Sequence, residues 1–323
     1  MQRTSMRRDG LDLKTTEYRV AQLLAWGTRQ LEQADIPSER LDAEVLLAEA
    51  LGCSRAQLLA RMRQNAPKSA ISRFVSFIER RKTREPIAYI LGEQAFYGRE
   101  FIVNEHVLIP RPETEELVER VLYALAHRYD PIDKTPPTFI LPSAYAFPST
   151  PLRVADIGTG SGAIAVTLAA EVPTLQLSAV DISAKAVDVA RQNAKRHGVA
   201  SQIAFYQGSL LLPLFGMPSF DLIVANLPYV GTSEMALMDP DVKAYEPHQA
   251  LFAGPQGLDL FQPFFQQLSE SQLLQPNGTV LLEIGFAQGP ALLQLANSYF
   301  PTAKKIALYQ DLAHHDRFIE LRL

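Results

Sequence analysis

The sequence predicts a two-domain protein of the α/β class, in which a small N-terminal helical bundle precedes a Rossmann-like, mostly parallel sheet. Apolar residues recur at helical spacing over residues 17–83, interrupted by proline and glycine, which predicts about four short helices. From residue 152 onward, five β-rich runs alternate with helical patterns, as in a sheet whose parallel strands are connected by helices on both faces. A chain of 323 residues, 47% of them hydrophobic, is long enough to bury both cores.

Three parts are predicted along the chain. Residues 1–84 form the helical domain, residues 85–111 form a β-hairpin linker rich in β-branched and aromatic residues, and residues 112–323 form the sheet domain. Pro112 suits the first turn of the helix that opens the sheet domain. Residues 130–151 contain six prolines without periodicity, so we expect a surface insert there.

Within the sheet domain, the last twenty residues predict two further strands, which can form an antiparallel hairpin. The predicted strands before them are 152–158, 175–182, 202–208, 220–226 and 278–285, and the predicted helices are 162–171, 183–197, 258–273 and 287–298. Ligands of such sheets bind beyond the carboxyl ends of the strands. The turns that follow the strands are therefore the candidate site.

Composition excludes several classes of protein. No apolar run approaches the roughly 20 residues that a membrane span needs, and the basic first residues lack the apolar segment of a secretory signal. Cys53 is the only cysteine, so the chain has no internal disulfide and no thiolate metal cluster. The six histidines are scattered, and we expect no metal site. We expect a cytoplasmic protein that does not associate with membranes.

Charge is distributed unevenly. Residues 1–84 contain 16 Lys and Arg against 10 Asp and Glu, whereas residues 85–323 contain 15 against 25. The acidic larger part disfavours a protein that follows a phosphate backbone, so no stable direct binding to nucleic acid is expected. The basic first part can meet an acidic or ribonucleoprotein partner, although an ordinary solvated helical surface also explains its charge.

The turn after the first predicted strand of the sheet reads Asp-Ile-Gly-Thr-Gly-Ser-Gly over residues 156–162. Glycines let the backbone turn sharply and approach a ligand, and the helix that follows offers free N–H groups. Asp181 ends the next strand, nineteen residues after Gly162, where a carboxylate can accept hydrogen bonds from both ribose hydroxyls of an adenosine. The predicted cofactor-binding residues are Gly158, Thr159, Gly160, Ser161, Gly162, Asp181 and Asn226.

Two cofactors fit this turn, and a tight turn that binds nothing is the third possibility. NAD or FAD fits because Gly158, Gly160 and Ala163 satisfy the looser dinucleotide pattern. S-adenosylmethionine fits because it has no phosphate and carries an ammonium and a sulfonium. Asp156, two residues before the first glycine, would repel a pyrophosphate and favour those cations. We therefore predict S-adenosylmethionine.

A second motif, Asn226-Leu227-Pro228-Tyr229, follows the fourth predicted strand of the sheet. The side-chain oxygen of Asn226 and the backbone carbonyl of Leu227 can accept both hydrogens of a planar –NH2 group. Pro228 holds Leu227 extended, and Tyr229 offers an aromatic wall for a flat amide or base. We therefore predict Asn226 as the catalytic residue and all four residues as the substrate-binding motif, although such a turn can also be only structural.

Further motifs accompany these two turns. They are residues 84–92 (Arg-Glu-Pro-Ile-Ala-Tyr-Ile-Leu-Gly), 96–98, 107–115, 245–247, 250–251, 257–258, 282–285, 311–312 and 316–317. With them, the sequence resembles the HemK/PrmC family of class I methyltransferases over nearly its whole length. The resemblance implies a class I S-adenosylmethionine-dependent fold and methylation of the side-chain amide nitrogen (N5) of a glutamine, in the GGQ motif of class-1 peptide chain release factors.

The resemblance is not complete. Leu227 stands where the family usually has a proline, and Ser209 and Leu210 stand where it often has an acid and a large side chain against the adenine, so no residue is assigned to the adenine. A DNA or RNA amino-methyltransferase acting on adenine or cytosine shares the glycine turn and the Asn-x-Pro-Tyr motif, but it needs a positive channel. A binding module without turnover would keep the fold alone. We expect residues 1–84 to recognise the protein substrate.

Overall fold

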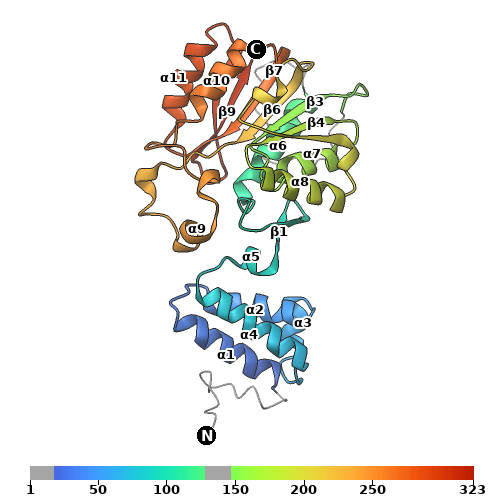
Figure 1. Ribbon diagram of the computed structural model, residues 1–323, viewed down its shortest axis with the longest axis vertical. Coiled ribbons are helices and arrows are strands. Elements are labelled where there is room, and N and C mark those ends of the chain that lie inside the picture. Colours follow the sequence, from blue (N-terminus) through green and yellow to red (C-terminus); the bar gives the residue numbers. More distant parts are fainter. Residues whose placement is uncertain (1–17, 128–146) are drawn as a thin grey trace. The chain divides into compact units, whose positions relative to one another are not determined.

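The computed structural model describes residues 18–127 and 147–323 (Figure 1). The chain divides into two compact units. The first, which we call the helical unit, comprises Met1–Gly92 together with Asp239–Tyr245. The second, the sheet unit, comprises Glu93–Met238 and Glu246–Leu323. Most of the predicted insert lies outside the described residues.

The helical unit is built around one apolar core. Leu23, Leu46 and Phe74 are fully buried in it, and the ring of Trp26 meets that of Phe74 edge-on with centroids 6.0 Å apart. Its helices are α1 (Val20–Glu32), α2 (Glu39–Ala50), α3 (Arg55–Ala60), α4 (Lys68–Lys82), α5 (Ile87–Leu91) and α9 (Pro240–Tyr245). The run of short helices predicted from apolar spacing is therefore present.

The predicted hairpin linker over residues 85–111 is wrong in its first part. Residues 87–91 form helix α5, which ends at Gly92 in the left-handed conformation (φ +81°). The hairpin is confined to β1 (Glu93–Phe96) and β2 (Arg99–Ile102), which pair antiparallel. Packing overrides the strand preference of these β-branched residues, because Ile90 is buried in the helical core.

The helical unit also takes in a segment from much later in the chain, which the predicted contiguous domains did not include. The buried guanidinium of Arg81 donates to Asp42 at 2.7 Å and to Asp241 of α9 at 2.6 Å. The hydroxyl of Tyr245 donates to the carbonyl of Thr83 at 2.7 Å. These bonds explain why Asp239–Tyr245 belongs with residues that precede it by about 160 positions.

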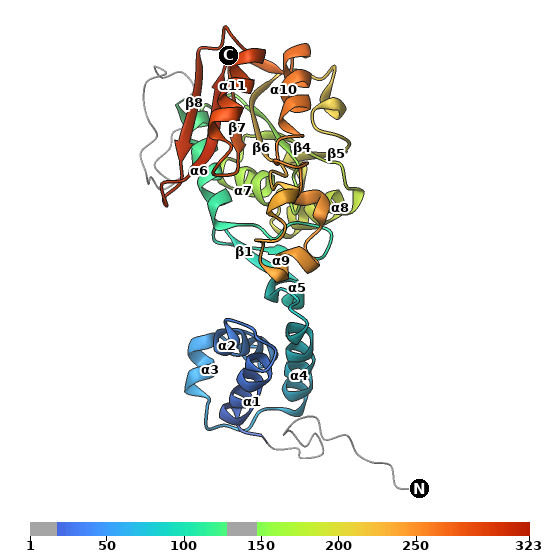
Figure 2. The same cartoon turned by 90° about the vertical axis from the view of Figure 1, so that its left-hand side faces the viewer.

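The sheet unit contains a seven-stranded sheet in the order β5-β4-β3-β6-β7-β9-β8. Its strands are β3 (Arg153–Ile157), β4 (Gln176–Asp181), β5 (Ile203–Gln207), β6 (Phe220–Asn226), β7 (Leu274–Glu283), β8 (Lys305–Gln310) and β9 (Asp316–Arg322). The first five are parallel, β9 is antiparallel to both neighbours, and β8 lies at the edge (Figure 2). The predicted fold class is confirmed, and the terminal strands form an antiparallel hairpin.

Helices cover both faces of this sheet (Figure 1). They are α6 (Pro112–Ala126), α7 (Ala163–Glu171), α8 (Ala184–Arg196), α10 (Phe261–Glu270) and α11 (Gly289–Tyr299). Successive strand residues point to opposite faces, so that Val154 joins the core under α6 and α7 while Ala155 joins the core under α10 and α11. None of the helices in the described ranges has the length and apolar character to cross a bilayer.

The strand order determines where a ligand can bind. The chain runs outward from β3 through β4 to β5 and then returns to the other side of β3 as β6. The order of the strands thus reverses beside β3, and a crevice opens there at the carboxyl ends. The glycine turn follows β3, Asp181 ends β4 and Asn226 ends β6, so the predicted residues meet at this edge.

Candidate cofactor and acceptor site

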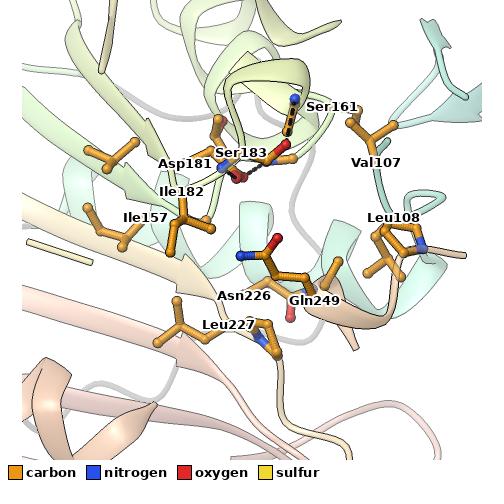
Figure 3. A pocket seen from close by; sticks show the side chains of 18 of the residues that line it. Val107, Leu108, Ile157, Ser161, Asp181, Ile182, Ser183, Asn226, Leu227 and Gln249 are labelled. Atoms are coloured by element: carbon orange, nitrogen blue, oxygen red, sulfur yellow. Dashed lines mark hydrogen bonds between the residues drawn. The ribbon is translucent and has the colours of Figure 1, made fainter. Parts of the chain in front are cut away.

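A cavity of about 400 Å³ lies at this edge, formed entirely by residues of the sheet unit. Its volume falls within the range of small-molecule sites. In Figure 3, Asp181 and Ser183 face the cavity from one strand end, and Asn226 and Leu227 face it from another. Val107 and Leu108 lie on the opposite side of the cavity from Ile157 and Ile182 (Figure 3).

The glycine turn presents bare backbone to the cavity. Gly158, Gly160 and Gly162 have φ angles of +75°, +55° and +79°, which residues with a Cβ rarely adopt. A Cβ at Gly162 would also lie 3.0 Å from the Cβ of Ala190 on α8. The amides of Gly158 and Thr159 both donate to the carbonyl of Val180, at 2.8 and 2.9 Å, and so hold the turn against β4.

Asp181 faces the cavity with its carboxylate held by backbone groups. One oxygen accepts from the amide of Gly160 at 2.8 Å and the other from the amide of Ser183 at 2.9 Å. Burial raises the pKa of Asp181, and these N–H donors oppose the rise. Each carboxylate oxygen keeps a second lone pair, so Asp181 can accept from the pair of ribose hydroxyls predicted for this position.

Asn226 lies across the cavity at the end of β6. Its side-chain NH2 donates to the hydroxyl of Thr114 on α6 at 3.0 Å, and its Oδ1 accepts no hydrogen bond from the residues that the structure describes. Leu227 and Pro228 also line the cavity, and the side chain of Leu227 packs toward Gly158. The structure therefore brings Asn226, Leu227 and Pro228 together with the glycine turn and Asp181.

Tyr229 is not among the residues that line this cavity, and its role as an aromatic wall for the substrate stays a prediction. Its hydroxyl donates to Glu283 on β7 at 3.1 Å, and burial raises its pKa. Its carbonyl accepts from the side-chain amide of Gln288 at 2.8 Å. A Cβ at Gly257 would lie only 1.9 Å from that carbonyl, so a residue without a side chain is required there. The hydroxyl and the carbonyl of Tyr229 are thus both bonded, and these bonds anchor the motif.

Comparisons with known proteins agree with this geometry. Residues 22–92 match the model of the PrmC N-terminal domain, and residues 141–239 match that of the methyltransferase small domain. Release factor glutamine methyltransferase of Nitratidesulfovibrio vulgaris is 36% identical over 93% of this chain and 94% of its own length. The protein of that name from Enterococcus faecalis is 39% identical over 93% and 97%. The chain belongs to the release factor glutamine methyltransferase family. A third member, from Koribacter versatilis, is 41% identical over 80% of this chain and 84% of its own length.

Asp156 does not have the position that the sequence predicted for it. It is fully buried and outside the lining of the cavity, where it accepts hydrogen bonds from the hydroxyl of Thr159 at 2.6 Å and the amide of Ala165 at 3.2 Å. Burial raises its pKa from the usual 3.8 to about 7. Its carboxyl group therefore stabilises the glycine turn from behind, and the predicted contact of its charge with a ligand is wrong.

Several residues of the site were not predicted from the sequence. Glu283 and Thr114 lie within motifs of the family resemblance, but no role was assigned to them. Glu246, also fully buried, accepts from Arg111 at 2.5 Å and from the amide of Ile109 at 3.1 Å, which fixes one wall of the cavity. A buried acid at the end of an apolar strand is the signal that points to Glu283.

Other positions around the cavity complete the site. Ile182, half-exposed beside Asp181, offers an apolar side chain to the cavity, and Ser209 and Leu210 also line it. The described residues contain no group of three or more His, Cys, Asp or Glu side chains that could hold a metal ion.

Proposed function

We propose that this chain transfers the methyl group of S-adenosylmethionine to the side-chain amide nitrogen (N5) of a glutamine in class-1 peptide chain release factors. The observation that carries the proposal is the Oδ1 of Asn226, which lacks a partner among the described residues and belongs to a side chain lining the same cavity as the glycine turn. Relatives at 36–41% identity bear the name release factor glutamine methyltransferase.

The polar and apolar groups that line the cavity fit S-adenosylmethionine. Asp181 would accept from the ribose hydroxyls, the backbone of residues 158–162 would receive the amino acid part, and Ile182 and Leu210 would contact the adenine. When bound, the cofactor supplies a methyl group made electrophilic by the sulfonium. Because Asp156 is fully buried and does not line the cavity, the cofactor contacts are assigned to these residues and not to Asp156.

Asn226 and Leu227 act on the amide of the substrate glutamine. Its nitrogen is a poor nucleophile, because its lone pair is delocalised into the carbonyl. Asn226 Oδ1 and the carbonyl of Leu227 accept its two N–H bonds and so direct the lone pair toward the methyl carbon. In the transfer, the nitrogen–carbon bond would form as the carbon–sulfur bond breaks, the sulfur would keep the electron pair of that bond, and the nitrogen would give up one proton to solvent. The rate gain comes from proximity and orientation.

The helical unit is the proposed recognition element for the release factor. Residues 1–84 carry a balance of +6, in contrast to the acidic remainder of the chain. Opposite charge steers association with an acidic or ribonucleoprotein partner. Such a role places the enzyme in the cytoplasm, where translation takes place, without stable binding to nucleic acid of its own.

The test is to map where the methyl group goes. The protein is incubated with isotopically labelled S-adenosylmethionine, a release factor and duplex DNA, and each product is examined by mass spectrometry. A matched release factor, with asparagine in place of the accepting glutamine, serves as the control. We expect the label on the glutamine alone. A label on an adenine or cytosine amino group, or on the control release factor, would overturn the proposal.

A further inference from the structure

We infer that Thr114 and Glu283 are positioning residues that determine which way the side-chain amide of Asn226 faces. This inference rests on the proposed function, because it concerns how Asn226 meets the substrate amide. Neither residue needs to touch the reacting atoms: the Thr114 hydroxyl binds Asn226, and Glu283 binds Thr114.

The number of protons in this chain of hydrogen bonds decides the orientation. The Thr114 hydroxyl donates its single proton to Glu283 Oε2, 2.8 Å away. When Glu283 is ionised, its carboxylate can only accept, so the Thr114 oxygen then has only a lone pair left to offer Asn226. The amide of Asn226 must then turn its NH2 toward Thr114, at 3.0 Å, and its Oδ1 the other way. A reversed amide would place two acceptors together with no proton between them.

Glu283 also fixes the far end of the acceptor motif. Its second oxygen, Oε1, accepts from the hydroxyl of Tyr229 at 3.1 Å. Asn226 and Glu283 are direct partners in the register of β6 and β7. The buried side chain of Glu283 binds the last residue of the motif directly and the first residue through Thr114. Thr114 comes from the first turns of α6, which makes three separate elements meet at this carboxylate.

Burying the carboxylate of Glu283 lowers the stability of the fold, and its role in orienting Asn226 explains why it is kept. Its side chain is 1% exposed, and no Lys or Arg lies within ion-pair distance of it among the described residues. An apolar side chain of similar size at such a position is commonly as good or better for stability. Two donors, Thr114 and Tyr229, satisfy one oxygen each, as a buried carboxylate requires.

The orientation matters for the chemistry. The substrate –NH2 presents donors, so it needs an acceptor from Asn226. A reversed Asn226 would offer its own NH2, and two donor groups would face each other. The relay from Glu283 through Thr114 therefore selects the productive orientation before the substrate arrives, which is the kind of preorganisation that raises turnover.

The experiment compares Thr114→Val with Thr114→Ser in the full chain. Valine keeps the shape and removes the hydroxyl, whereas serine keeps the hydroxyl. Single-turnover methylation of the release factor should slow about thirtyfold in Thr114→Val and less than about threefold in Thr114→Ser. The dissociation constant of S-adenosylmethionine should stay within about twofold in both.

The double variant distinguishes orientation from packing. Because Thr114 acts through Asn226, adding Thr114→Val to Asn226→Ala should slow the reaction no further. An additive loss, or equal losses in the valine and serine variants, would show that Thr114 only fills space. An unchanged rate in Thr114→Val would also overturn the inference. Failure of the wild-type protein to methylate the glutamine would instead refute the proposed function.

Discussion

Replacing Glu283 with glutamine should raise the free energy of unfolding at alkaline pH and should slow methyl transfer. Glutamine has the same shape and can accept from Tyr229 while donating to Thr114. Burial raises the pKa of Glu283 from its usual 4.5 to about 7. Thr114, Tyr229 and Arg317 oppose the rise, and the negative charge of Glu113 adds to it.

The sign and the size of the effect follow from this shift. Between pH 4.5 and about 7 the folded state holds a proton that the unfolded state has lost, so the free energy of unfolding falls as the pH rises. A shift of this size, at about 1.4 kcal/mol per unit, costs about 3 kcal/mol above pH 7. The side chain introduced by Glu283→Gln does not ionise. The free energy of unfolding of this variant, relative to that of the wild type, should therefore rise by about 3 kcal/mol from pH 4 to pH 8.5.

The assay is urea unfolding of both proteins across this pH range. Circular dichroism should follow the transition, because Trp26, the only tryptophan, lies in the helical unit and reports on that unit. Glu270→Gln, the same change at an exposed residue of α10, serves as the matched control and should show no growing difference. A difference between Glu283→Gln and wild type that does not change with pH would refute the reasoning.

Outcomes are expected for four further variants. Asp181→Ala should weaken binding of S-adenosylmethionine by about 1–3 kcal/mol in calorimetry, because hydrogen bonds to a charged group are lost, and unchanged affinity would remove Asp181 from the ribose. Asn226→Ala should lower kcat/KM at least about a hundredfold, or ~2.7 kcal/mol, with cofactor affinity kept, whereas Leu227→Pro should keep near-normal turnover because the carbonyl survives. Asp241→Asn should destabilise the helical unit by about 1–3 kcal/mol, measured by Trp26 fluorescence, because the buried Arg81 loses a charged acceptor, and an unchanged unfolding midpoint would contradict this.

The fold of the sheet unit was largely predictable from the sequence. Parallel strands buried on both faces give continuous apolar runs, and helices between them give a different period, so β3 to β7 and the helices α7 and α8 could be located. Helix α5 could not, because Ile87 and Ile90 favour strands in isolation and become helical only against the helical core.

The sequence predicted the residues of the candidate site that lie in short motifs at the ends of strands, but not the contacts between distant parts of the chain. The glycine turn follows β3, Asp181 ends β4 and Asn226 ends β6, and the sheet brings these strand ends together. The bond between Thr114 and Glu283 joins residues 169 positions apart, and depends on how α6 packs on β7. Likewise, sequence could not show that Asp156 is buried behind the turn, because burial is decided by tertiary packing.

The long-range tie between Arg81 and Asp241 has a consequence for synthesis on the ribosome. The N-terminal helices emerge first, but one of the two carboxylates bound to the guanidinium of Arg81 appears 160 residues later. Domains generally fold as units during translation, the N-terminal one first. Here the first unit stays incomplete until the acceptor motif and α9 have both been made. A chain that stops before Asp241 keeps the ion pair of Arg81 with Asp42 but lacks the second carboxylate that accepts from the Arg81 guanidinium. The first unit is then less stable and more exposed to quality control.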